Sequence, residues 1–186
     1  MTIEEAIKAR HSVRAYKEQS LTEDVVNVLE EKIAELNREG NLHMQLILNE
    51  PKAFQGTLAK YGKFRGVSNY IVVAGKKTDD LDERVGYYGE HLVLFAQTLG
   101  LNSCWVGLSY SKVPGTYVLE DGEKIACYIA IGYGETHIFA KDFKITTNKY
   151  ETDCSTFCSV TDGCYSLWRP LGPTGRFPRK ESWSCS

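Results

Sequence analysis

Two arginines and a hydroxyl group lie within five residues near the start of the chain, in the run Arg10-His11-Ser12-Val13-Arg14. The planar guanidinium group of arginine presents several donors in a fixed fork that matches the oxygens of a phosphate. Because the run directly follows a short predicted helix, it could cradle a phosphate and the polar edge of a bound cofactor. A solvated basic turn is an equally good interpretation of the spacing alone.

Two later segments place glycine where a backbone could approach a ligand closely. The first is a predicted helix that ends at Gly100 and is followed by a strand, Ser103-Cys104-Trp105-Val106, which leads into Gly107. Glycine at such a strand end permits close approach, although core packing explains nearly every side chain in this stretch. The second is Ile129–Gly134, whose Gly-x-Gly is weak by itself and lacks the context of a dinucleotide-binding loop. We find no Ser-His-Asp or Cys-His arrangement.

Together and in this order, these three segments resemble the FMN-dependent nitroreductase family, over about residues 1–135. The matching motifs are the early R-x-S-x-R, the helix end A-Q-x-L-G-L, the strand and loop C-W-V-G, and the strand end I-G-Y-G. The resemblance implies a homodimer that binds FMN at the subunit interface. It also implies ping-pong transfer of electrons from NADH or NADPH to a small-molecule acceptor such as a nitroaromatic or a quinone.

The resemblance assigns roles to individual residues of this chain. Positions that match the family motif would hold the FMN phosphate through Arg10, His11 and Ser12, and the ribityl chain or pyrimidine edge through Arg14. The isoalloxazine would lie along Val106 and Gly107, with the Gly107 N–H directed towards N5, and Lys141 and Lys144 would supply the later basic pair. The flavin carries the chemistry in this family, so no catalytic side chain is expected.

One family segment is absent from the translated sequence, namely a run like L-A-P-T-[AG]-x-N-x-Q that packs near the flavin. Codons for Leu167–Arg176 can encode this whole run in a shifted reading frame, because the single Trp168 codon followed by an arginine codon beginning CG gives alanine there. We therefore hypothesise that the chain leaves the family frame between about residues 138 and 150, which the nucleotide sequence tests. The alternative function is an impaired relative that keeps the fold but binds flavin weakly or not at all.

Four of the six cysteines lie in the last third of the chain, at positions 154, 158, 164 and 185. A zinc site or a disulfide pair are competing interpretations of this cluster, but the spacing Cys154-x3-Cys158 differs from the commonest zinc pairs. Under the reading-frame hypothesis the cysteines are accidental. Cys104 and Cys127 lie in apolar runs and are expected to be buried.

The elements that must position these residues can be predicted from hydrophobic periodicity. We expect helices over residues 2–10, 22–38 and 79–99, a helix or turn over 54–64, and strands over 43–48, 69–74, 103–106 and 124–133. This alternation predicts an α+β layered domain, and the family resemblance adds a central, mostly antiparallel sheet flanked by helices. We expect one domain over residues 1–140 and an atypical, loop-like tail over 141–186.

Composition excludes several classes of function. The 186 residues are 42% hydrophobic and carry a formal net charge of −2, which fits an ordinary globular domain and not a basic nucleic-acid-binding surface. No apolar run approaches the ~20 residues of a membrane helix. The acidic start, Met1-Thr2-Ile3-Glu4-Glu5, lacks the apolar core of a secretory signal. A cytoplasmic protein without nucleic-acid or membrane partners is therefore expected.

Overall fold

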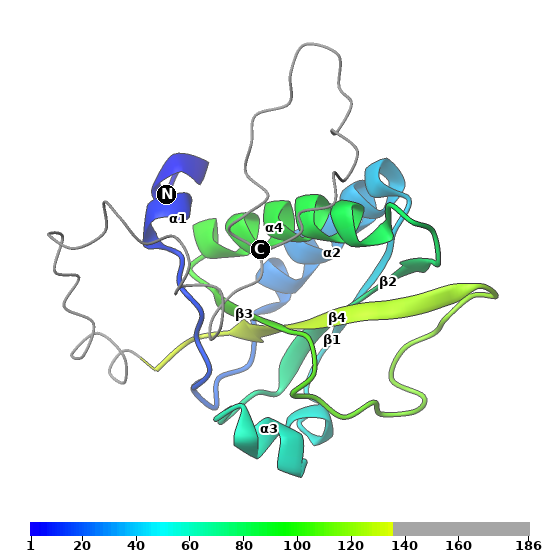
Figure 1. The fold of residues 1–186 in the computed structure, drawn as a ribbon. Helices are drawn as coiled ribbons and strands as arrows, with labels where there is room; N and C mark the ends of the chain where they lie inside the picture. Colours follow the sequence, from blue (N-terminus) through cyan, green and yellow to red (C-terminus); the bar gives the residue numbers. More distant parts are fainter. Residues whose placement is uncertain (136–186) are drawn as a thin grey trace, which may run out of the picture. The chain divides into compact units, whose positions relative to one another are not determined.

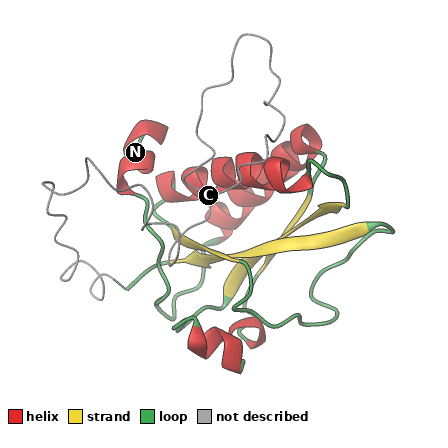
Figure 2. Cartoon of the chain, viewed as in Figure 1, coloured by secondary structure: helices red, strands yellow, loops and turns green. Residues whose placement is uncertain are grey.

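The computed structural model describes residues 1–135. Along this part of the chain the elements are α1 (Ile3–Ala9), α2 (Glu23–Gly40), β1 (His43–Ile47), the 3-10 turn η1 (Lys52–Phe54), α3 (Thr57–Tyr61), β2 (Asn69–Lys76), α4 (Leu81–Thr98), β3 (Asn102–Val106) and β4 (Glu123–Gly132) (Figures 1 and 2). The three predicted helices and four predicted strands are present, with ends that differ by at most two residues, and the helix or turn predicted over 54–64 contains the shorter helix α3. The α+β fold class is confirmed.

The four strands form one sheet in the order β1-β2-β4-β3, and every neighbouring pair is antiparallel. The pairing of β2 with β4 is the longest and contains a register shift between Val73 and Ala74. Since β2 and β4 are the inner strands, β2 is buried from Asn69 to Gly75. Burial on both faces explains why this strand reads as a continuous apolar run without alternation.

Each face of the sheet packs against a different set of elements. On one face, α2 and α4 contribute to an apolar cluster that includes Leu29, Leu36 and Leu92 (Figure 1). On the other face, η1, α3 and the loop after β3 enclose a second cluster around Phe54, Tyr70, Tyr128 and their neighbours. The sheet therefore separates two apolar cores, one on each face.

The helix ends show where local sequence rules held and where packing overrode them. The predicted capping box of α1 is present, with Thr2 and Glu5 bonding each other's backbone N–H groups. Gly100 follows α4 with a φ of +80°, as a helix-terminating glycine does. Helix α2 continues two residues past its predicted end at residue 38, so that Gly40 is its last helical residue and Asn41 takes the left-handed cap. A Cβ at Gly40 would overlap the ring of Tyr88, so close helix packing explains this glycine.

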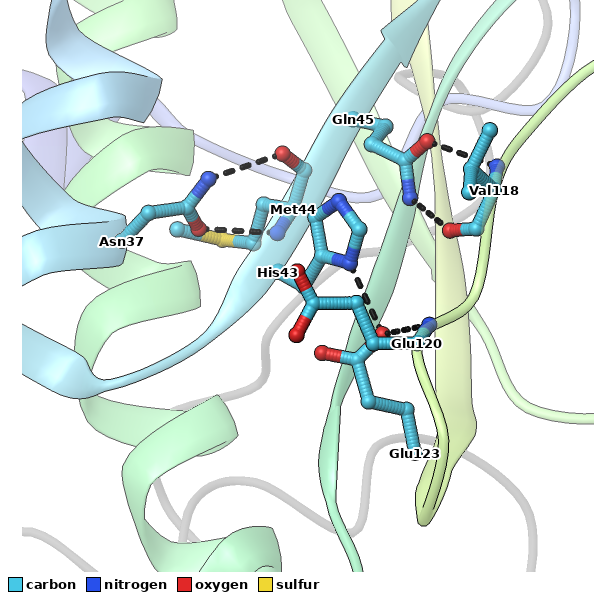
Figure 3. Close-up of polar contacts among 7 residues, drawn as sticks. All are labelled: Asn37, His43, Met44, Gln45, Val118, Glu120 and Glu123. Carbon is cyan, nitrogen blue, oxygen red and sulfur yellow. Dashed lines mark hydrogen bonds and ion pairs between the residues drawn. The ribbon is translucent and has the colours of Figure 1, made fainter.

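Side chains tie the edge strand β1 to its surroundings (Figure 3). The Asn37 amide bonds both the N–H and the C=O of Met44, while the Gln45 amide does the same for Val118 in the loop before β4. His43 Nδ1 lies 2.8 Å from Oε2 of Glu123. The Asn37 pairing satisfies backbone groups that the edge strand leaves open, and the other two pairings connect β1 to the chain around the start of β4. Among residues 1–135, no helix is both long enough and apolar enough to span a bilayer.

Candidate functional site

The arginine-containing segment is an extended strand-like crossing held on both sides by backbone hydrogen bonds. Arg10 ends α1 with an extended backbone, and Ser12 then bridges Ser103 in β3. Further on, the N–H of Tyr16 bonds the carbonyl of Arg65, and the N–H of Lys17 bonds the carbonyl of Tyr133. Along this path the side chains of Val13, Ala15 and Tyr16 are buried. Their burial anchors the backbone and so fixes the positions from which the neighbouring polar side chains extend.

Arg10 lies against α4, in contact with a carboxylate that the sequence analysis did not single out. Its Nε is 3.4 Å from Oε1 of Glu90, and the arginine side chain is only 10% exposed. The second oxygen of Glu90 accepts a hydrogen bond of 3.0 Å from the indole Nε1 of Trp105 in β3. The Arg10 Nη1 atom is buried and has no hydrogen-bond partner within the described residues.

Arg14 lies on the other side of the sheet edge. Its Cζ is 5.9 Å from the ring centroid of Phe64, a residue of the loop that follows α3. Its Nε is buried and has no hydrogen-bond partner in the described part of the chain. Arg10 therefore contacts the α4 side and Arg14 the α3 side. The two guanidinium groups of the motif are not gathered at one point, and could contact separate parts of an elongated ligand.

The other members of the motif are less constrained. His11 is exposed, and its Nδ1 lies 3.2 Å from the carbonyl oxygen of Ala9 at the end of α1. Ser12 is half-buried through its bridge to Ser103. The Ser103 hydroxyl is itself buried without a partner among residues 1–135. Unsatisfied buried polar atoms are rare in folded proteins and call for an explanation, such as a bound ligand.

Val106 and Gly107 differ sharply in environment. Val106, the last residue of β3, is buried with the apolar cluster on the α3 face, so its side chain is committed to the core. Gly107 is exposed, and an added Cβ would meet no described atom within 4 Å. Neither packing nor a left-handed backbone requires glycine there. The open space beside its backbone is compatible with a flat ligand.

A stack of tyrosines anchors the loop that follows Gly107. The ring of Tyr110 stacks on Tyr128 with centroids 3.8 Å apart, and Tyr128 stacks in turn on Tyr70 at 5.1 Å. The Tyr70 hydroxyl donates to Oε2 of Glu50. Burial is the main reason that the pKa of Tyr70 rises to about 12 and that the pKa of Tyr128 is also raised. These phenols stay neutral at physiological pH and serve as packing surfaces.

Some predicted features lie elsewhere or cannot be placed. Lys141, Lys144 and the four tail cysteines lie outside the described residues, as does the proposed change of reading frame. His91 in α4 is exposed, and its ring centroid lies 4.7 Å from that of Tyr87. Cys104 is buried as expected, whereas Cys127 is only partly buried. A hollow of about 440 Å³ near Phe54 and Val67 includes none of the predicted ligand-binding residues.

The antiparallel sheet, its helices and the arginine motif at its edge define a protein of the nitroreductase fold. The chain matches the model of the family described as "Putative TM nitroreductase" over residues 2–157, which is most of its length, and it belongs to this family. The match continues past residue 135, where the motifs that carry the sequence resemblance end.

Solved structures share the fold at low sequence identity. A nitroreductase from Bacteroides fragilis with bound FMN is 20% identical and has a TM-score of 0.57, covering 80% of this chain and 97% of its own. An FMN-dependent nitroreductase from Clostridium difficile is 17% identical and has a TM-score of 0.55, covering 72% and 88%. No protein in the curated set matches. Together, the family and these neighbours support a flavin-dependent oxidoreductase in general terms.

Proposed function

We propose that this protein is an FMN-dependent oxidoreductase that passes electrons from NADH or NADPH to a small acceptor such as a nitroaromatic or a quinone. The observation that carries the proposal is a pair of buried guanidinium nitrogens in the predicted cofactor motif, Arg10 Nη1 and Arg14 Nε, that find no hydrogen-bond partner among residues 1–135. A buried guanidinium N–H without an acceptor is costly, and an anionic ligand relieves that cost.

The residues present fit FMN in both charge and extent. Arg10 would bind the phosphate with Ser12 and His11 nearby, while Arg14, on the other side of the sheet edge, would contact the ribityl chain or the pyrimidine edge. The backbone beside Gly107 would face the ring, where no described side chain intervenes. When bound, FMN supplies hydride acceptance and electron transfer, and the protein's part is to bind, orient and shield it.

Flavin titration tests the proposal directly. The full-length protein should bind FMN and show flavin absorbance that bleaches with NADH or NADPH under anaerobic conditions and returns when a quinone or nitroaromatic is added. Arg10→Gln should weaken FMN binding roughly tenfold or more, the cost of a lost charge-assisted contact. Arg38→Gln, which removes an exposed arginine in the last turn of α2, should leave binding unchanged.

The contrary result is equally specific. A folded protein that stays colourless and ignores added FMN would favour the alternative, a relative that keeps the fold without turnover.

We further propose a homodimer with flavin at the subunit interface and a cytoplasmic location. Lys141 and Lys144 would add to the phosphate site.

A further inference from the structure

Glu90 occupies a position between the candidate cofactor motif and the helix-covered core. It belongs to α4, 80 residues from Arg10 in the sequence, and its carboxylate contacts two groups at once. One oxygen faces Arg10 Nε and the other accepts from Trp105 Nε1. The hydrogen bond from Trp105 in β3 therefore holds the carboxylate in place independently of its contact with Arg10.

The fit between α4 and β3 holds Trp105 in turn. A Cβ at Gly89 would overlap the indole ring, with Cζ2 at 3.1 Å, so the ring packs directly against the helix backbone at this point. Trp105 also packs against the apolar cluster of α2 and α4. This packing leaves the indole few alternative positions, and its Nε1 is directed at Glu90.

The consequence falls on Arg10. Its guanidinium group is a rigid plane, so the contact of Nε with Glu90 restricts the direction of the other nitrogens. Nη1 is left buried and unpartnered among the described residues, available to an anion. Preorganised donors of this kind bind tightly because little ordering remains to be done when the ligand arrives.

We propose that Glu90 is a positioning residue that orients Arg10 towards the phosphate group of the cofactor, and that Trp105 fixes Glu90 for this task. This inference rests on the proposed function, since it assigns the anion as the phosphate of FMN. The competing interpretation, on electrostatic grounds alone, is that a carboxylate beside Arg10 competes with the phosphate for the guanidinium group. The two roles predict opposite responses to substitution.

The test compares FMN with riboflavin, which has the same ring and ribityl chain but no phosphate. Glu90→Asp keeps the charge but retracts the carboxylate by one methylene, about 1.5 Å, so that it cannot reach both Arg10 and Trp105. It should weaken FMN binding roughly tenfold and leave riboflavin binding unchanged. Glu90→Gln keeps the reach but leaves one acceptor oxygen for two donors, Arg10 Nε and Trp105 Nε1, so it should also weaken FMN binding and leave riboflavin binding unchanged. Glu83→Asp, exposed on the first turn of α4, is the matched control.

A double variant then shows whether Glu90 acts through Arg10. In an Arg10→Gln background, Glu90→Asp should cause no further loss of preference for FMN over riboflavin. Trp105→Phe keeps an aromatic ring but removes the donor, and should lower the preference in the same direction by about threefold.

Several outcomes would overturn the assignment. Equal weakening of both flavins by Glu90→Asp would show a general structural role, and tighter FMN binding by Glu90→Gln would show competition. If Arg10→Gln abolishes the preference for FMN while Glu90→Asp does not change it, the proposed function stands and the role of Glu90 fails. A wild-type protein that binds neither flavin overturns both.

Discussion

At the scale of single residues, Gly89 determines how closely α4 can approach the indole ring of Trp105. An added methyl group at this position would overlap that ring, which is partly buried and packs against the apolar cluster. Overpacking of a filled core typically costs about 1–3 kcal/mol. We therefore expect Gly89→Ala to lower the free energy of unfolding by about that amount in urea denaturation, although alanine is the better helix former.

Gly86 provides the control on the same helix. A Cβ at Gly86 meets no described atom within 4 Å, so Gly86→Ala should raise stability by about 0.5–1 kcal/mol through helix propensity alone. If both substitutions stabilise to a similar extent, the packing of Trp105 against α4 is looser than the structure indicates.

Residue types alone revealed half of the candidate site. Arg10 and Arg14 could be found because two guanidinium groups in five residues have a recognisable chemistry. Glu90 could not, since a carboxylate within an amphipathic helix ordinarily faces water, and its partners Arg10 and Trp105 are distant in sequence. The contact of Arg14 with Phe64 is likewise a product of tertiary packing. The one available signal for Glu90 was a charged residue in the middle of a predominantly buried helix.

At the scale of elements, the contact of β1 with the start of β4 depends on a buried carboxylate. Burial tends to raise the pKa of Glu123, but hydrogen bonds from His43 and the Glu120 N–H, with the charges of His43 and Lys76, outweigh it and leave the pKa lowered (Figure 3). A carboxyl group whose pKa is lower in the folded protein contributes its full stabilisation when the pH is above its pKa in the unfolded chain. That contribution disappears as the pH falls through its pKa in the folded protein.

We therefore expect Glu123→Gln to lower the free energy of unfolding at pH ~7 by about 1–2 kcal/mol, measured by urea denaturation. The difference from wild type should shrink as the pH falls below the ordinary pKa of a glutamate and through the lowered pKa of folded Glu123, where the wild-type carboxylate becomes protonated. Glu120→Gln, whose side chain is exposed, should stay within about 0.5 kcal/mol at either pH. A difference that is independent of pH would mean that shape, and not charge, determines the role of Glu123.

Periodicity predicted the elements well, and their ends less well. The long stripe of α2 and the apolar run of β2 are features that single segments carry in their own sequence. Gly40 packs closely against Tyr88 of another helix, a contact that the sequence of α2 alone does not show, and α2 ends two residues later than predicted. The strand order β1-β2-β4-β3 is not visible in any one segment, and the family resemblance implied only a central, mostly antiparallel sheet.

At the scale of the whole molecule, the described chain leaves apolar side chains exposed on α1. Ile3 and Ile7 are 48% and 49% exposed, one helical turn apart, and Met1 is exposed beside them. Pairs four residues apart lie on the same side of a helix, so these residues form one apolar strip. An interface covering such a strip is consistent with the homodimer that we propose.

If α1 lies in that interface, a charge placed there should separate the subunits. We expect the wild-type protein to sediment with twice the mass of one 20.9 kDa chain and Ile7→Glu to shift the equilibrium towards the single chain at equal concentration. Burial of an unpaired carboxylate in an apolar contact opposes association. Lys8→Gln changes the formal charge by the same amount at the neighbouring exposed position and should leave the mass unchanged. An Ile7→Glu protein that remains dimeric would place the interface on another surface, and a monomeric wild type would contradict the proposed homodimer itself.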